Sequence, residues 1–132
     1  HALVDALLGA IGAGDIGTHF PDTDPRWKGQ ASSLFLEEAA RMVRQRGMGI
    51  GNIDATVILE KVKLREWKTV IADRIREILA PFHPLGADAV SVKAKTNERC
   101  DSIGEGQAIA AQVVVLLEDL PGGAGSGKGG RI

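Results

Sequence analysis

The sequence has little from which to build covalent or aromatic contacts: one cysteine, no tyrosine, and 4% aromatic residues in a chain of 132. Cys100 alone cannot form an internal disulfide, so the cysteine content is compatible with a reducing compartment. Because aromatic side chains are scarce, few platforms are available on which bases or sugars could stack. We expect any bound nucleotide to be held largely by backbone groups and small side chains.

The sequence also lacks an excess of one charge and a long apolar run. Its formal net charge is −1, which gives no basic footprint for nucleic acid. The longest strongly apolar stretch is VVVLL, residues 113–117, well short of the roughly 20 residues that span a bilayer. We therefore expect neither nucleic acid nor a membrane as a partner.

An initiator methionine and a recognisable targeting segment are missing as well. The chain begins at His1, and it shows neither the order of charged, apolar and small residues of a signal peptide nor an arginine- and serine-rich transit segment. We interpret the chain as truncated or excised at its N-terminus.

Three stretches have helical periodicity. Apolar spacing predicts a helix over residues 1–11, ended by the glycines that follow. A second helix is expected to be capped by Ser32 and Ser33 and to end at Gly47. A third is predicted over residues 66–79. Its buried stripe is expected to consist of Trp67, Val70, Ile71, Ile75 and Ile78.

Other stretches favour strands. Alternation and β-branched residues predict strands over residues 52–63 and 89–97. Residues 107–120 fit a third strand or a buried helix, and the run of valines favours the strand. Because strands alternate with helices, we predict an α/β fold, a single domain with helices packed on one face of a mixed sheet. We expect that domain over residues 1–120 and a flexible glycine-rich tail over 121–132.

A long loop rich in proline, aspartate and glycine is predicted over residues 14–30. Loops of this length in compact domains are usually functional. GAGDIG, residues 12–17, spells a dinucleotide-binding fingerprint, but it follows a helix and leads into prolines. The tail begins like a phosphate-binding loop, but glycine follows Lys128 where a hydroxyl residue is needed. Both matches are accidental.

The polar residues on and beside this loop leave two interpretations open. Asp15, Asp22 and Asp24 could accept substrate hydroxyls or, with His1 and Asp5, hold divalent metal ions. Alternatively, the aspartates cap turns.

Two residues at predicted strand ends are similarly ambiguous. Glu98 could bind a hard metal ion or be a solvated charge. Lys63 could meet a phosphate or serve only solubility.

Four segments together resemble one enzyme family. HALVDALLGAIGAGDIGTHFPDTDPRWKG, GNIDATVILEKVKL, VSVKAKTNE and GEGQAIAAQ are similar to the 2-C-methyl-D-erythritol 2,4-cyclodiphosphate synthases of non-mevalonate isoprenoid biosynthesis. The resemblance covers residues 1–117, and the combination of HALxDALLGA with GDIGxxFPDTDP is highly specific. It implies an α/β domain that assembles as a homotrimer, with active sites between neighbouring subunits.

The resemblance also implies a cyclisation that needs no protein nucleophile. The 2-phosphate of 4-diphosphocytidyl-2-C-methyl-D-erythritol 2-phosphate attacks the β-phosphorus, and CMP leaves. Catalysis would then consist of positioning, with charge neutralisation by zinc and a second divalent ion. The sequence agrees with this chemistry, since it has no Ser-His-Asp or Cys-His signature.

The family's site residues carry over by position. Asp15, Ile16 and Gly17 match the loop that holds the erythritol hydroxyls, and Phe20, Pro21, Asp22, Thr23 and Asp24 match the substrate-contacting loop after it. Residues 59–65 match the strand end and turn whose backbone holds the cytidine part, with Lys63 beside its phosphate. The site residues expected there are Leu59, Val62, Lys63, Leu64 and Arg65. Thr96 matches the residue that steadies the transition state, and Lys95, Asn97 and Glu98 beside it are expected to contact the substrate. His1 matches a zinc ligand, and Glu98 matches the ligand of Mg²⁺ or Mn²⁺.

The chain departs from the family pattern in several places. Ser102 and Glu105 stand where bacterial relatives commonly carry an aromatic residue and an arginine. Val62 stands where proline is frequent, which loosens a preset backbone angle. The Asp-x-His pair that completes the zinc site is missing. Because catalytic zinc needs three protein ligands, we expect this segment to bind zinc weakly and to turn over little.

Two alternatives and a location follow from the same resemblance. The chain could be an inactive, truncated cytidine-binding trimer scaffold, or a fragment of a fusion with the cytidylyltransferase of the pathway. The expected location is the cytoplasm for a bacterial protein and the plastid for a plant or algal one.

Overall fold

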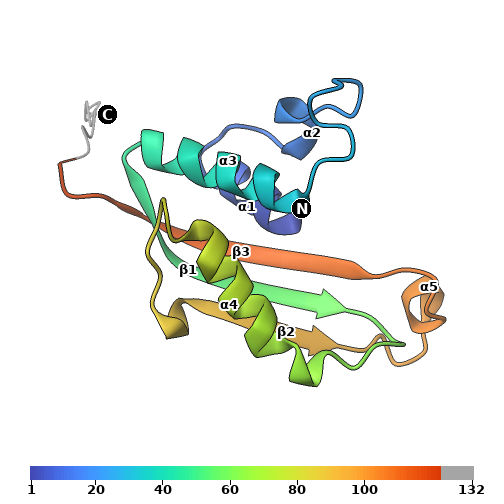
Figure 1. The fold of residues 1–132 in the computed structure, drawn as a ribbon. Coiled ribbons are helices and arrows are strands. Elements are labelled where there is room, and N and C mark those ends of the chain that lie inside the picture. Colours follow the sequence, from blue (N-terminus) through green and yellow to red (C-terminus); the bar gives the residue numbers. More distant parts are fainter. Residues whose placement is uncertain (123–132) are drawn as a thin grey trace, which may run out of the picture.

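The computed structural model describes residues 1–122, so nearly all of the tail predicted over 121–132 lies outside the described residues. The elements in chain order (Figure 1) are α1 (Ala2–Ala10), α2 (Ile16–His19), α3 (Ser32–Gln45), β1 (Met48–Ile58), the 3₁₀ turn η1 (Leu64–Glu66), α4 (Lys68–Leu79), the 3₁₀ turn η2 (Ala87–Ala89), β2 (Val90–Lys95), α5 (Asp101–Gly104) and β3 (Ala110–Asp119).

The three strands form a mixed sheet in the order β2-β1-β3. β1 runs parallel to β2 and antiparallel to β3. Its register against β3 shifts by one residue at Gly51, where a bulge interrupts the ladder. The carboxyl ends of β1 and β2 therefore meet at one edge of the sheet, next to the beginning of β3. The loops that follow β1 and β2, which contain many of the predicted site residues, lie at that end of the sheet.

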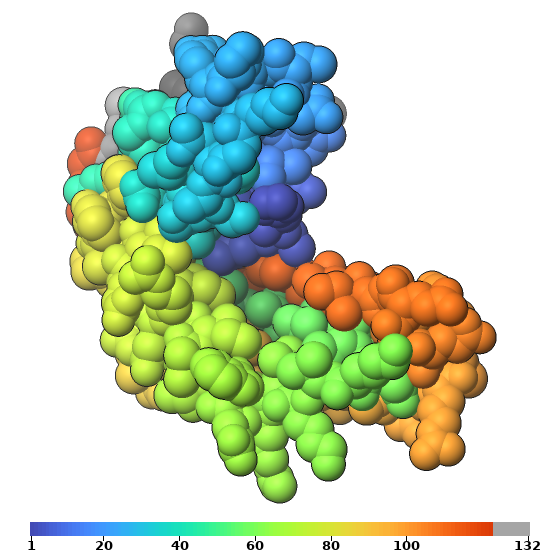
Figure 2. Space-filling view, turned by 45° about the vertical axis from the view of Figure 1, so that its right-hand side comes forward, coloured from blue at the N-terminus to red at the C-terminus, as the bar shows by residue number. Residues whose placement is uncertain are grey.

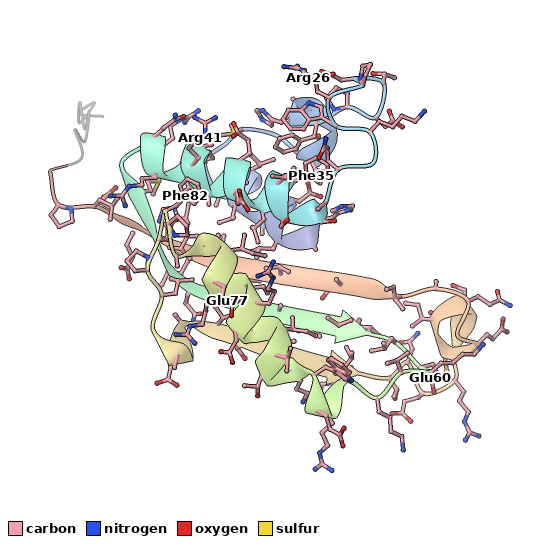
Figure 3. The ribbon with its side chains drawn as sticks, viewed as in Figure 1. Arg26, Phe35, Arg41, Glu60, Glu77 and Phe82 are labelled. Carbon is pink, nitrogen blue, oxygen red and sulfur yellow. The ribbon has the colours of Figure 1, made fainter. Side chains whose placement is uncertain are left out.

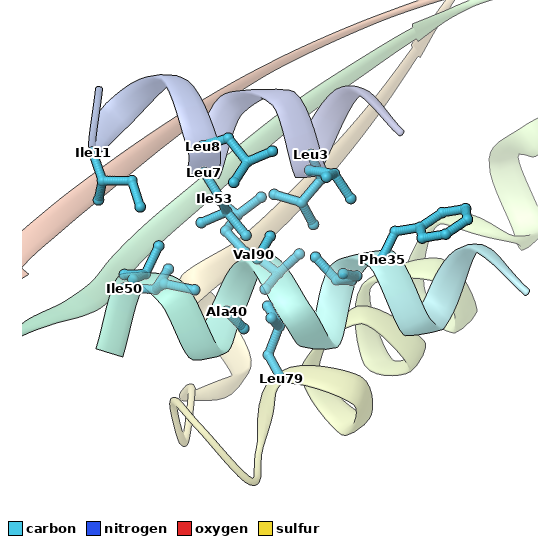
Figure 4. Close-up of a cluster of buried hydrophobic side chains, with 14 of the residues drawn as sticks. Leu3, Leu7, Leu8, Ile11, Phe35, Ala40, Ile50, Ile53, Leu79 and Val90 are labelled. Carbon is cyan, nitrogen blue, oxygen red and sulfur yellow. The ribbon is translucent and has the colours of Figure 1, made fainter. Parts of the chain in front are cut away.

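The long helices cover one face of the sheet, as predicted. α1 packs over β3, α3 over β1 and α4 over β2. Figure 4 shows the core between these layers, with Leu7 of α1, Ile53 of β1 and Leu79 of α4 completely buried. The opposite face of β3 is open, and its Val114 and Leu116 are 70% and 58% exposed. The predicted fold class is confirmed, and residues 107–120 contain a strand and not a helix.

Several local predictions need correction. The loop over residues 14–30 contains the short helix α2, which Asp15 caps. Neither Ser32 nor Ser33 caps α3, because its cap position is Ala31 and no side chain bonds there. β1 is shifted toward the N-terminus relative to the predicted strand, since the chain turns away at Glu60.

The predicted stripe on α4 is only partly buried. Trp67 and Val70 are 56% and 54% exposed, because the first turn of α4 extends past the core beneath it. Ile75 and Ile78, nearer the end of the helix, do pack against the core. Among the described residues, no helix is both long and apolar enough to cross a membrane.

Candidate functional site

A hollow of about 840 Å³ opens beside the N-terminus. Of the residues predicted for the erythritol loop and the zinc site, those that line it are His1, Ile16, Gly17, Phe20, Pro21 and Asp22. Its apolar wall is an aromatic cluster in which the ring centroids of Phe20 lie 5.0 Å from Trp27 and 4.9 Å from Phe35. The His1 ring lies 6.1 Å from Phe35, and its Nε2 is 3.1 Å from the hydroxyl of Ser32. The hollow thus combines an apolar wall with an imidazole, a hydroxyl and a carboxylate.

Two carboxylates next to this hollow hold the backbone of α2, which forms part of its wall. Asp5 accepts a hydrogen bond from the backbone N–H of Ile16 at 2.8 Å, which anchors the beginning of α2 to α1. Asp15 accepts from the hydroxyl and the N–H of Thr18, at 2.7 and 2.9 Å. These two bonds lower the pKa of Asp15, because they stabilise its ionised form. The side chain of Asp15 caps α2 and does not line the hollow.

The turn after α2 has a similar internal brace. The backbone N–H of Asp24 donates to the carbonyl of Pro21, so Asp22 and Thr23 occupy the centre of a turn. Asp24 pairs with the guanidinium of Arg26 at 2.7 Å, and this bond lowers the pKa of Asp24. Of these aspartates only Asp22 lines the hollow, so the turn-capping interpretation describes Asp15 and Asp24 in this structure.

A second hollow, of about 330 Å³, lies where β1 and β2 end. It is lined by Leu59, Val62, Lys63, Leu64, Arg65, Lys95 and Thr96, all predicted, and by Glu60, Lys68 and Ala94. No aromatic side chain takes part, as expected from the composition. The backbone N–H of Leu59 donates to the carbonyl of Lys95, which ties the two strand ends together. Small apolar side chains and four cationic ones therefore surround one opening.

The loop after Thr96 holds Glu98 in an unusual backbone conformation. Glu98, Arg99 and Asp101 have φ angles of 50°, 62° and 59°. A residue with a Cβ costs on the order of 1 kcal/mol in this left-handed region. The hydroxyl of Thr96 donates to Oε1 of Glu98 at 3.1 Å. The Glu98 carboxylate, which is exposed, is thus fixed directly after the second hollow.

The two hollows share no residue. Figure 2 shows the N-terminal segments and the strand ends with α5 as two projections on either side of a wide notch. The structure therefore brings the predicted residues together as two groups. His1 and Glu98, the two predicted metal ligands, belong to different groups.

The donor set fits one of the two predicted metals. A single exposed carboxylate such as Glu98 is sufficient for Mg²⁺ or Mn²⁺, which complete their coordination with water and substrate phosphates. Zinc needs three protein ligands, and residues 1–122 contain no group of three or more His, Cys, Asp or Glu side chains suited to a metal. Among residues 1–122, a magnesium site at Glu98 would rest on one carboxylate, and a zinc site at His1 would lack two protein ligands.

Sequence reasoning did not single out several lining residues. Trp27 and Phe35 are far apart in the sequence, although three of the five aromatic residues of the chain meet here. Lys68 is the first residue of α4, three residues after the turn that was predicted to bind cytidine ends at Arg65. Figure 3 places Glu60 at the end of β1, facing the loop that leads into α5. Its partner, Asn97, is 37 residues away, so no local pattern marks it.

Comparisons with known proteins agree with the motifs. A curated relative named bifunctional enzyme IspD/IspF, from Erythrobacter litoralis, is 50% identical over 123 residues, 92% of this chain and 31% of the relative. A chloroplastic 2-C-methyl-D-erythritol 2,4-cyclodiphosphate synthase of Arabidopsis thaliana is 49% identical over 119 residues, 89% of this chain and 49% of the relative. The chain thus spans about a third of the length of the first relative and about half of the second.

A solved structure and a family model complete the comparison. The CDP complex of IspF from Plasmodium falciparum superposes with a TM-score of 0.72 at 32% identity, covering 92% of this chain and 70% of that one. The family model described as YgbB family matches residues 1–118. The resemblance seen in the sequence is confirmed, and the chain belongs to the YgbB family.

Proposed function

We propose that this chain is the catalytic domain of a 2-C-methyl-D-erythritol 2,4-cyclodiphosphate synthase. In the reaction, an oxygen of the substrate's 2-phosphate forms a bond to the β-phosphorus of the diphosphate. The bond from that phosphorus to the bridging oxygen breaks, and CMP leaves with the electron pair. No group of the protein needs to become covalently attached.

One observation carries the proposal: the hollow at the ends of β1 and β2 is followed, two residues after Thr96, by the fixed carboxylate of Glu98. A small apolar pocket lined by cations suits a pyrimidine nucleotide with a charged diphosphate. The CDP complex of the Plasmodium falciparum relative supports cytosine as the base.

Each residue group then has a task that its position supports. Leu59, Val62 and Leu64 would enclose the cytosine, while Lys63 and Lys95 would offset charge on the phosphates. Thr96 would donate its hydroxyl to an oxygen of the diphosphate. A divalent ion at Glu98 would supply further charge neutralisation when bound. The hollow beside His1, with Asp22 and Gly17 on its wall, would receive the hydroxyl-rich part of a substrate.

A homotrimer belongs to the same proposal. The two hollows lie apart in one chain, and the resemblance implies that neighbouring subunits complete each site. The open face of the sheet, with Val114 and Leu116, would pack against the other copies. The bifunctional relative supports a cytidylyltransferase module fused to, or associated with, this domain.

Release of CMP from the diphosphocytidyl substrate tests the function. When this domain is part of a protein with a complete zinc site, CMP should be released in step with formation of the cyclic diphosphate, and the rate should depend on zinc and on added Mg²⁺ or Mn²⁺. Chelation of divalent ions should stop the reaction. Formation of CMP without the cyclic product would mean hydrolysis, and would contradict the proposal.

A further inference from the structure

The strained loop that carries Glu98 is held by Glu60 and Asp101, to which the resemblance assigns no individual role. Left-handed backbone at Glu98 and Arg99 is unfavourable for these residue types, so the surroundings must hold it. The backbone N–H of Asn97 donates to Oε2 of Glu60 at 3.1 Å, and its side-chain amide donates to Oδ2 of Asp101 at 2.8 Å. Asn97 is thus fixed from both sides.

Asp101 anchors the other end of this segment. Its Oδ1 accepts from the backbone N–H of Ile103 at 2.8 Å and lies 3.4 Å from that of Gly104. The same Asn97 amide also donates to the carbonyl of Cys100 at 3.1 Å. Gly104 allows the close approach that results, because a Cβ there would collide with the backbone of Arg99.

Glu60 connects this loop with the second hollow. Its side chain lines that hollow, and its bond to Asn97 joins the turn after β1 to the turn after β2. Between Glu60 on one side and Asp101 on the other, residues 97–101 have little freedom to relax. Glu98 lies inside this segment, and Thr96, which bonds to its carboxylate, directly precedes it.

We propose that Glu60 and Asp101 are positioning residues, which act through Asn97 to hold the Glu98 carboxylate and the Thr96 hydroxyl in one fixed arrangement. The assignment of a metal to Glu98 rests on the proposed function. The hydrogen-bond network around Asn97 is observed in the structure and does not depend on that function.

Glu60 offers a clean substitution series. Glu60→Ala removes the acceptor of the Asn97 N–H, whereas Glu60→Gln keeps an acceptor oxygen. Glu66→Ala is the matched control, because Glu66 is an exposed carboxylate in the same connection and does not line the hollow. At Asp101, Asp101→Ala removes the anchor, and Glu105→Ala, in the next turn, is its control.

The measurements are Mn²⁺ affinity, CMP release and thermal unfolding of each variant. We expect Glu60→Ala and Asp101→Ala to weaken Mn²⁺ binding and to lower kcat by roughly tenfold, the loss of one hydrogen bond to a charged group. KM for the diphosphocytidyl substrate should stay near its original value at saturating metal. Glu60→Gln should recover most of both losses, and the two controls should behave like the original protein.

The possible failures can be told apart. A protein that binds Mn²⁺ and shows these affinity changes, but does not release CMP, would refute the proposed function and leave the positioning role intact. Unchanged Mn²⁺ affinity in a folded Glu60→Ala variant, or no recovery in Glu60→Gln, would overturn the positioning role. A wild-type protein that binds no Mn²⁺ would overturn it as well.

Discussion

At the scale of single residues, similar carboxylates have different tasks according to their partners. Asp5, Asp15 and Asp24 bond to backbone groups or to Arg26 and shape the wall of the first hollow. Asp22 lines that hollow, and Glu98 receives a bond from Thr96 at an exposed position. The partners of each carboxylate, and not its residue type, thus decide its task in the described structure.

Replacing Glu98 should separate metal binding from folding. Glu98→Gln keeps the size of the side chain and an acceptor for Thr96 but removes the charge. We expect CMP release at limiting Mg²⁺ to fall by at least about tenfold, because the ion loses its anionic ligand. Raising the Mg²⁺ concentration should restore part of the rate. If CMP release at limiting Mg²⁺ did not change, the assignment of Glu98 to the metal would be wrong.

Asp15 should make the free energy of unfolding depend on pH in the acidic range. Its pKa is lowered in the folded state, so its ionised form stabilises the fold above its ordinary pKa of 3.8, and this contribution is lost as pH falls through the lowered value. Asp15→Asn keeps one acceptor oxygen without the charge. We expect the free energy of unfolding to be lower in the variant at neutral pH, and the difference to vanish in strong acid. Urea unfolding at a series of pH values measures this, and a difference that is independent of pH would contradict it.

At the scale of elements, the burial of α4 is uneven along its length. Leu79 at its end is completely buried between α3 and the sheet, while Val70 near its beginning is 54% exposed. We expect Leu79→Ala to lower the free energy of unfolding by about 2–5 kcal/mol, because a cavity remains in the core. Val70→Ala should change it by less than about 0.5 kcal/mol. Urea unfolding of both variants measures the contrast, and equal losses would mean that the whole stripe is buried in solution.

The same unevenness explains what could be predicted from the sequence. Periodicity identified α1, α3 and α4, because it reports which residues share a face. It does not report how far the partner surface extends, so Trp67 and Val70 were wrongly expected inside. α2 was missed because four residues are too few for helical periodicity, although Asp15 at its N-cap and Thr18 form a local signal. The ambiguous residues 107–120 became a strand through pairing with β1.

In the candidate site, too, some residues could be predicted from the sequence and others could not. The family resemblance predicts roles for Thr96, Glu98 and the turn after β1, because these residues fall in short matched segments. Glu60 and Asp101 depend on contacts with Asn97, and the left-handed backbone there is visible only in three dimensions. Residues grouped in one motif can be proposed as ligand contacts from the sequence. The more distant residues that hold such a motif in position, here Glu60 and Asp101, cannot.

At the scale of the whole molecule, the arrangement is one-sided. The helices cover one face of the sheet, while the other exposes Val114 and Leu116. We expect a protein of three copies in solution, measured by light scattering or sedimentation. Val114→Lys should dissociate it, because a charge would be buried between copies. Within one chain the new ammonium would lie opposite Asp54, so the fold should survive.

Val70→Lys is the control for that experiment, since Val70 lies on α4, which covers the other face. It should leave the mass unchanged. A wild-type protein that remains a single chain would contradict the trimer. A trimer that survives Val114→Lys would show that another surface joins the copies.

The bulge at Gly51 has a consequence for how the chain tolerates length changes. Ile50 and Ile53 both belong to the core, although residues three apart in a regular strand point to opposite faces. The extra residue thus corrects the phase between the two halves of β1. Deleting Gly51 would remove the bulge and leave a regular ladder, in which Ile50 and Ile53 are two residues apart and still share the core face. The half that pairs with β2, from Ile53 to Ile58, would keep its phase, so the strand end that supports the second hollow is buffered against insertions and deletions before it.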